Sequence, residues 1–234
     1  MNGIRVIELS SVDSTNDHAK ALARQGAAAG TVVFAHEQRA GRGRQGNRWV
    51  SAPGNLFMSV ILRPRVAAQN VGQLSFLAGL ALANVLSALI SADICLKWPN
   101  DVLVNQKKIA GILIETEGAG GGWAVVGIGL NIVSAPENAI ALRDARAGEK
   151  TPREMLDLIA FEISRLMTQW ESQGFADIRA GWMKRAWRLE GSLTARLPKG
   201  AVTGLFKGIN DDGALQLQLP DGKVELIASG EVFA

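Results

Sequence analysis

The feature that most constrains the fold is one long apolar stretch near the middle of the chain. Residues 76–90 are almost entirely apolar, and only Gly79, Asn84 and Ser87 interrupt them. No uninterrupted apolar run approaches the roughly 18 residues that a membrane span needs. The surrounding segment, residues 71–91, has helical spacing and is rich in alanine and leucine. We therefore expect a buried helix at the centre of a globular domain, and no membrane span.

The composition is consistent with one sizeable core. The chain has 234 residues, of which 47% are hydrophobic and 20% charged, so apolar burial can offset the entropy of ordering and disorder is excluded. Cys95 is the only cysteine, which excludes an intrachain disulfide and a cysteine-based zinc site. The first residues lack the basic-then-apolar pattern of a signal peptide. We therefore predict a cytoplasmic protein.

Strands and helices are mixed along the first 188 residues. Ser14 is the predicted N-cap of a helix that extends to about residue 25, with Asp17 at its third position. Thr151 begins a second helix, residues 151–173, in which Glu154 completes a capping box. A shorter helix is expected at residues 175–187. Strands are expected at residues 4–9, 31–37, 55–62, 94–97, 102–104, 108–115 and 123–130, the last two joined through a glycine-rich turn at 118–122.

The character of the sequence changes after Leu189. Short strands at residues 192–196, 201–209, 214–218 and 223–228 alternate with turns rich in Asp and Gly. We therefore divide the chain into residues 1–188 and a small all-β domain, residues 189–234. This domain carries four basic and six acidic residues, a net charge of −2, so the remainder of the chain, whose overall net charge is +3, carries +5.

The basic excess is concentrated in a loop between two strong strands. This arginine loop, residues 38–49, contains four arginines that alternate with glycines and no acidic residue. Glycine lets the backbone approach an anion closely, and arginine offers a planar fork of donors to phosphate or carboxylate. The loop matches neither the Walker pattern nor the dinucleotide fingerprint. It therefore indicates anion binding, with a solvated basic loop and a single-stranded RNA contact as alternatives.

Three further motifs follow the arginine loop: residues 97–101 (KWPND), 108–115 (KIAGILIE) and 127–131 (GIGLN). Each has an ordinary explanation when taken alone. A lysine at the start of a strand is typical of a sheet edge, a Gly-x-Gly of close packing, and an asparagine at a strand end of a turn.

Together, and in this order with Ser14-Thr15-Asn16 and the arginine loop, the motifs resemble those of the biotin protein ligases. The resemblance covers residues 6–131 and continues weakly to the C-terminus. It implies an α+β fold of the class II synthetase type: a mixed, largely antiparallel sheet with helices packed on one face, and a C-terminal SH3-like β-barrel. It also implies a ligase that converts biotin and ATP into biotinyl-5′-adenylate and pyrophosphate. The ligase then transfers biotin to one lysine of the biotin carboxyl carrier protein of acetyl-CoA carboxylase.

The resemblance also assigns residues to these steps. Lys108, Arg42 and Arg44 are the expected catalytic cations. Gly127 joins two other glycines in the floor of the pocket. Mg²⁺ is expected to be carried by ATP and to lie near Asn131 or Asp101. Lys97 has two open roles, in catalysis or in shaping the turn. Biotin-binding residues are expected to be Ser14, Thr15, Asn16, Gln38, Gly41, Arg42, Gly43, Arg44, Lys108, Gly111 and Gly129, and ATP-binding residues Arg44, Arg48, Trp49, Asn100, Lys108 and Asn131.

The chain departs from the family pattern in three ways. Bifunctional members carry a winged helix-turn-helix before the Ser-Thr-Asn segment, whereas here thirteen residues precede Ser14, so we expect the monofunctional type, without DNA binding. Asn47 stands where a basic residue is frequent, and the chain has no tyrosine. Monomer and homodimer both remain open.

Three other functions are compatible with parts of this pattern. Lipoate or octanoate ligases and transferases share the core fold but lack the arginine loop. A non-catalytic protein could bind biotin without turning over ATP. A nucleic-acid binder is disfavoured because no set of aromatic residues interleaves the arginines.

Overall fold

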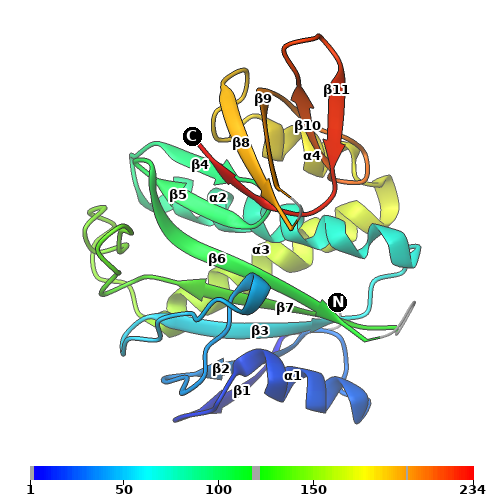
Figure 1. The fold of residues 1–234 in the computed structure, drawn as a ribbon. Helices are drawn as coiled ribbons and strands as arrows, with labels where there is room; N and C mark the ends of the chain where they lie inside the picture. The colour runs from blue at the N-terminus through cyan, green and yellow to red at the C-terminus, as the bar shows by residue number, and fades with distance from the viewer. Residues whose placement is uncertain (1–2, 118–121, 199) are drawn as a thin grey trace.

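A computed structural model describes residues 3–117, 122–198 and 200–234, which form two sheets with four α-helices (Figure 1). The main sheet has the strand order β1-β2-β3-β7-β6-β5-β4. The predicted turn at 118–122 lies largely outside the described residues. The strands of the main sheet are β1 (Arg5–Leu9), β2 (Thr31–Ala35), β3 (Leu56–Leu62), β4 (Ile94–Lys97), β5 (Asp101–Val104), β6 (Lys107–Thr116) and β7 (Ala124–Leu130).

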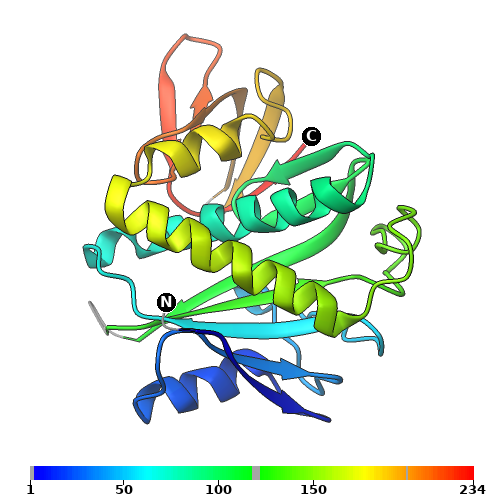
Figure 2. The same cartoon turned by 180° about the vertical axis from the view of Figure 1, so that it is seen from behind.

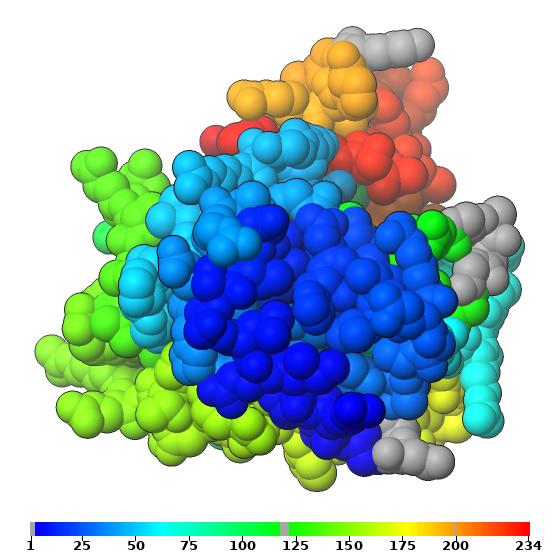
Figure 3. Space-filling model, turned by 90° about the horizontal axis from the view of Figure 1, so that it is seen from below, coloured from blue at the N-terminus to red at the C-terminus, as the bar shows by residue number. Residues whose placement is uncertain are grey.

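The main sheet is mixed and largely antiparallel, as predicted. Only β1 and β2 run parallel, because α1 (Thr15–Arg24) forms the crossover between them. The other neighbouring strands are antiparallel. Seen from below, the N-terminal segment covers the centre of this side of the molecule (Figure 3).

Helices pack on both faces of the main sheet, which corrects the prediction of a single covered face. α2 (Leu74–Leu89) and α3 (Pro152–Gln173) share a core with Phe34 and Val126. α1 instead buries Ala19 and Ala23 against Val33, together with Ile61 and Val125. Successive strand residues point to opposite faces, so β2 and β3, which are buried along their whole length, present a buried surface on each side of the sheet. The views from front and back place α1 and α3 on opposite sides (Figures 1 and 2).

The central helix is buried as the sequence predicted. The segment Ala68–Leu89, a 3₁₀ turn followed by α2, is the one described helix long and apolar enough to cross a membrane by length and composition. In this fold, 61% of its most apolar window is buried against other parts of the chain. Its apolar character is therefore explained by its position in the core.

Both predicted helix N-termini have the expected caps. The Ser14 hydroxyl accepts a hydrogen bond from the Asp17 backbone N–H at 3.4 Å. At α3, the Thr151 hydroxyl accepts from the Glu154 N–H at 3.2 Å, while the Glu154 carboxylate accepts from the Thr151 N–H at 2.8 Å. Such reciprocal bonds satisfy backbone donors that the helix itself leaves unpaired.

The C-terminal strands form a separate sheet of order β11-β10-β9-β8-β12 that follows the short helix α4 (Ala176–Met183). Strand β12 was missing from the prediction. The predicted small C-terminal β domain is present, but among the described residues β11 and β12 remain at opposite edges, so its sheet does not close into a barrel. Its strands are β8 (Ser192–Leu197), β9 (Gly200–Ile209), β10 (Leu215–Gln218), β11 (Val224–Ile227) and β12 (Glu231–Phe233).

The smaller sheet packs directly on the α2 side of the larger unit. Phe206 and Leu217 belong to the same buried cluster as the α2 side chains. The Trp98 indole N–H donates to the Gly213 carbonyl at 3.0 Å, and the Gln73 amide donates to the Asp211 carbonyl at 2.9 Å. A unit of this size buries little surface on its own, and the shared core explains how it is stabilised.

A buried carboxylate between α2 and α3 leads to a first prediction. The Glu162 side chain, 13% exposed, accepts hydrogen bonds from Arg165 and from Asn84, each at 2.7 Å. The Arg165 guanidinium holds the pKa of Glu162 below its ordinary value, against the effect of burial. We expect Glu162→Gln to lower the free energy of unfolding by about 1 kcal/mol at pH 7.

This loss is fully present above the unfolded-state pKa of about 4.3 and disappears as the pH falls through the lower folded-state pKa. Urea unfolding of both proteins between pH 7 and pH 3 measures the difference. The exposed Glu137 supplies the control substitution, Glu137→Gln. A difference that stays constant with pH would contradict the role of the carboxylate charge.

Candidate functional site

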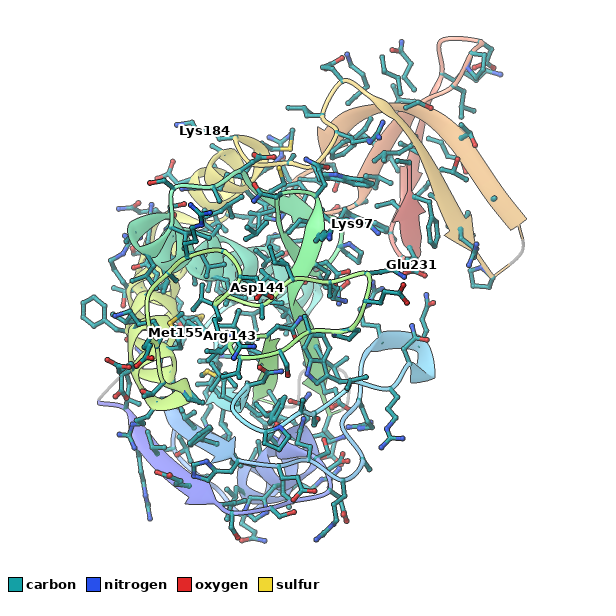
Figure 4. The ribbon with its side chains drawn as sticks, turned by 90° about the vertical axis from the view of Figure 1, so that its left-hand side faces the viewer. Lys97, Arg143, Asp144, Met155, Lys184 and Glu231 are labelled. Atoms are coloured by element: carbon teal, nitrogen blue, oxygen red, sulfur yellow. The ribbon has the colours of Figure 1, made fainter. Side chains whose placement is uncertain are left out.

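A cleft lies over the middle of β6 and β7 and is closed on one side by the arginine loop. The start of α1 lines one end, and the turn between β4 and β5 lines the other. The smaller sheet contributes Glu231, which Figure 4 shows near Lys97 at the junction of the two sheets. The lining residues thus come from segments that are far apart in the sequence.

Buried polar side chains occupy the α1 end of the cleft. Ser14, Thr15 and Asn16 are each at most 4% exposed. The backbone N–H and the hydroxyl of Thr15 donate to the Gln38 amide oxygen at 2.8 and 3.0 Å. The Ser59 hydroxyl lies within hydrogen-bond distance of both the Thr15 hydroxyl and the Asn16 amide oxygen, at 2.8 and 2.6 Å. This end can therefore present several fixed donors and acceptors to a small polar group.

The floor of the cleft is made of glycines. Gly111 on β6 lies opposite Gly129 on β7 in the strand register, and Gly127 is two residues away. The Trp49 indole lies on this bare surface: a Cβ added at Gly129 would overlap its ring, and one at Gly111 would be 2.9 Å from it. A Cβ at Gly127 would instead overlap the Asn16 amide. The positions of the Trp49 and Asn16 side chains therefore require glycine at these three positions.

Trp49 carries a donor that the described structure leaves unused. Its indole nitrogen is buried and has no hydrogen-bond partner among the described residues. The Lys108 ammonium nitrogen lies 5.5 Å from the centroid of the Trp49 ring, within the range of a cation–π contact. A buried unpaired donor costs free energy, so this indole suits a ligand that brings an acceptor.

An ion pair lies toward the end of the cleft that the turn between β4 and β5 lines. The Lys108 ammonium is 2.7 Å from a carboxylate oxygen of Asp101, and the Asp101 side chain is 17% exposed. The neighbouring Lys107 is exposed and is not among the lining residues. This placement matches the strand alternation that separates consecutive side chains.

Arg44 connects the arginine loop to the smaller sheet. Its guanidinium donates to the Gly230 carbonyl at 3.2 Å and is 3.5 Å from the Asn100 amide oxygen. Burial lowers the pKa of Arg44, although the nearby charges of Asp101 and Glu231 oppose that shift. The cation is thus partly desolvated and available for an anion in the cleft.

The cleft brings together most of the residues that the sequence singled out. Gly41 is buried beside it and is not a lining residue. Asn131 is 2% exposed, lies outside the lining, and donates at 3.4 Å to the Ile140 carbonyl. The lining includes Ser14, Thr15, Asn16, Gln38, Arg42, Gly43, Arg44, Arg48, Trp49, Lys97, Asn100, Asp101, Lys108, Gly111, Gly127 and Gly129.

Sequence reasoning missed two acidic residues. Glu231 lies on the unpredicted strand β12, so nothing in the local pattern placed it at the cleft. Glu115 ends the predicted strand motif, and its carboxylate binds Arg42 at 2.8 Å. An acidic residue close to the end of an apolar strand was the available signal for Glu115.

Comparisons with known proteins agree with this geometry. The family model described as "Biotin/lipoate A/B protein ligase family" matches residues 8–132, and "Biotin protein ligase C terminal domain" matches residues 193–234. The chain is 40% identical to the biotin–[acetyl-CoA-carboxylase] ligase of Paracoccus denitrificans, over 96% of this chain and 98% of the relative.

Two solved structures are also similar. The biotin protein ligase from Aquifex aeolicus in complex with biotin and ATP has a TM-score of 0.85 and 28% identity, covering 98% of this chain and 97% of that one. The Leishmania major biotin protein ligase in complex with biotinyl-5-AMP has a TM-score of 0.67 and 28% identity, covering 96% and 99%.

The glycine floor leads to a second prediction. We expect Gly129→Ala to lower the free energy of unfolding by about 1–3 kcal/mol, because the new methyl group displaces the Trp49 ring. Combining it with Trp49→Ala should cost less than the sum of the two single changes. Gly72→Ala is the matched control, since an added Cβ there has no neighbour within 4 Å. Urea unfolding measures all four variants, and additive losses would contradict the assigned contact.

Proposed function

The chain belongs to the biotin/lipoate A/B protein ligase family, and we propose that its cleft activates biotin with ATP and passes it to a carrier-protein lysine. The observation that carries this proposal is the layout of the cleft. Fixed polar groups lie at one end, an aromatic ring and glycines in the middle, and cations beyond them. This order suits a molecule with a polar head, an apolar body and a carboxylate tail.

At the α1 end, we assign the ureido head of biotin to Ser14, Thr15 and Asn16, with Gln38 beside them. Thr15 and Gln38 already bind each other, which holds both side chains in place. The apolar body would lie along the Trp49 ring and the floor of Gly111 and Gly129. The list of proposed biotin contacts is completed by Gly41, Arg42, Gly43, Arg44 and Lys108.

At the cationic end, two anions have to meet. The biotin carboxylate attacks the α-phosphorus of ATP, the bond from that phosphorus to the bridging oxygen breaks, and pyrophosphate leaves. Lys108 is the proposed catalytic cation between carboxylate and α-phosphate, while Arg42 and Arg44 balance the phosphate charge. Asp101 holds the Lys108 ammonium in place before substrates bind. Proposed ATP contacts are Arg44, Arg48, Trp49, Asn100, Lys108 and Asn131.

Mg²⁺ does not fit a site built by the protein. Among the described residues, no group of three or more His, Cys, Asp or Glu side chains could hold a metal ion, and Asp101 is already paired with Lys108. We propose that Mg²⁺ arrives on the phosphates of ATP, where oxygen and water ligands usually hold it. Asp101 and Asn131 stay as candidate second contacts.

In the second step, a lysine amine of the carrier protein attacks the acyl carbon and AMP leaves. Relatives named as acetyl-CoA-carboxylase ligases point to the biotin carboxyl carrier protein of that enzyme as the acceptor. The decisive experiment is mass spectrometry of such a carrier domain incubated with this protein, biotin and Mg-ATP. Biotin added at one lysine is the expected result. No added biotin, with lipoate added instead in a parallel incubation that contains lipoate, would overturn the proposal.

Several finer predictions belong to the same proposal. We keep the domain division at 188/189, an activity that does not involve DNA, and a cytoplasmic location. Both the monomer and the homodimer remain compatible with it.

The Lys108 assignment leads to a third prediction. Lys108→Ala should slow adenylate formation by roughly two or more orders of magnitude, the scale for removing one preorganised charge-stabilising group. Lys108→Arg should restore it only partly, because a planar fork replaces a compact charge. Lys107→Ala is the control and should stay near wild type, since that side chain is exposed outside the cleft. Biotin-dependent pyrophosphate exchange measures all three, and equal loss in both alanine variants would disprove the assignment.

A fourth prediction concerns retention of the intermediate. Arg44→Ala removes the side chain that joins the arginine loop to Gly230. We expect it to release free adenylate and thereby biotinylate lysines of unrelated proteins, with little change in the free energy of unfolding. Biotin blotting of a mixture of bystander proteins measures the release. A variant that labels only the carrier would argue against a retaining role.

A further inference from the structure

We propose that Glu115 is a positioning residue that holds the arginine loop closed over the biotin end of the cleft and, through the same carboxylate, orients Asn16. The proposal rests on the proposed function, because it names how this chain keeps its activated intermediate in place. Glu115 lies one residue before the end of β6 and belongs to none of the groups assigned above to substrate.

The carboxylate of Glu115 accepts hydrogen bonds from three side chains, which belong to two other parts of the chain. An Arg42 guanidinium nitrogen lies 3.0 and 2.8 Å from its two oxygens. The Asn16 amide donates to one oxygen at 2.8 Å, and the Lys20 ammonium to the other at 2.7 Å. Arg42 belongs to the loop, whereas Asn16 and Lys20 belong to α1. One side chain therefore joins the loop, the first helix and the sheet.

Arg42 has a second acidic partner, but that partner is less well placed to hold the loop. Asp17 accepts from the same Arg42 nitrogen at 2.8 Å, and its side chain is 51% exposed. The Glu115 side chain is 20% exposed. Water and salt screen an exposed pair more strongly than a partly buried one. Glu115 is therefore the partner that contributes more to holding Arg42.

The link to the cleft runs through Asn16. Because Glu115 accepts from the amide nitrogen, the amide oxygen of Asn16 has to point the other way, toward Ser59, at 2.6 Å. The same amide packs against Gly127, where any side chain would overlap it. The contacts with Glu115, Ser59 and Gly127 together fix the orientation of the Asn16 amide. Loss of the Glu115 charge weakens this orientation at the same time as it releases the loop.

The arrangement also permits the loop to open. Burial alone would raise the pKa of Glu115, but hydrogen bonds from Lys20, Asn16 and Arg42 hold it below its ordinary value. When Arg42 moves away with the loop, Lys20 and Asn16 still pair with the carboxylate. A buried carboxylate without a partner would cost several kcal/mol. Lys20 therefore keeps the open state accessible, so that substrates can enter.

The test compares Glu115→Gln, Arg42→Gln and the double variant. Glutamine keeps the size of the side chain and an acceptor for Asn16, and removes the charge that Arg42 binds. In the ligand-free proteins, we expect trypsin to cut after Arg44 and Arg48 about tenfold faster in each single variant, since an opened loop exposes these bonds. Bound biotinyl-5′-adenylate should dissociate about tenfold faster, because loss of a partly buried charged contact acts mainly on dissociation.

In trypsin cleavage of the ligand-free protein, the double variant should match Arg42→Gln, because without Arg42 the Glu115 charge has no loop contact left to lose. Glu117→Gln is the matched control: Glu117 follows on the same segment and pairs with Arg24 of α1 at 2.7 Å, away from the loop. It should change neither rate. If Glu115→Gln does not fold, Arg42→Gln and Asp17→Asn carry the test, and the former should have the larger effect.

Three results would overturn the proposal: cleavage and dissociation rates of Glu115→Gln equal to those of Glu117→Gln, additive effects in the double variant, or an Asp17→Asn effect as large as that of Arg42→Gln. The trypsin measurement needs no substrate. A protein that forms no adenylate but shows the predicted cleavage pattern would therefore reject the proposed function and retain the role of Glu115 in closing the loop.

Discussion

The absence of side chains at the centre of the main sheet is the constraint on which the site depends. Gly111 and Gly129 lie opposite each other in neighbouring strands, and Gly127 is close by. A strand residue with a Cβ at any of these positions would push away either the Trp49 ring or the Asn16 amide. Because the sheet is bare here, the arginine loop can lie close to it. The cleft therefore exists because β6 and β7 have glycines, and so no side chains, at these positions.

Charge balance lets such a basic loop fold against the sheet. Two carboxylates pair with cations at or beside the cleft: Glu115, toward the α1 end, with Lys20 and Arg42, and Asp101, toward the other end, with Lys108. These pairs offset the repulsion that crowded cations would otherwise exert on one another. An incoming carboxylate or phosphate can then take over a cation that the protein already holds in position. Binding of an anion and ordering of the loop are coupled in this way.

The smaller sheet completes the site from the other side. It supplies Glu231 to the lining and the Gly230 carbonyl that Arg44 binds, while Trp98 and Gly213 join the two units directly. Its strands share a hydrophobic core with α2. A change at this junction is thus expected to act on both the packing of the sheet and the position of the arginine loop.

Short sequence patterns were enough to predict most of the helices and strands and most of the residues that line the cleft. The capping residues Ser14 and Thr151 placed two helices, and short apolar runs bounded by turns placed eleven of the twelve strands found in the described residues. Ordered motifs identified the family and most of the residues that line the cleft, because the backbone and charge requirements at those positions are local.

Contacts between distant segments were decided only by the tertiary structure. Buried residues along one strand do not show which helix covers which face, so the sequence predicted one helix-covered face where the structure has two. Closure of the small sheet would need pairing between its two edge strands, β11 and β12, and the short β12 carries too few residues to give a pattern. Glu115 binds Asn16, which is 99 positions away, and Arg44 binds the carbonyl of Gly230, next to Glu231, across 186 positions. No local pattern specifies such contacts, because they follow from how the two sheets and the loop pack in space.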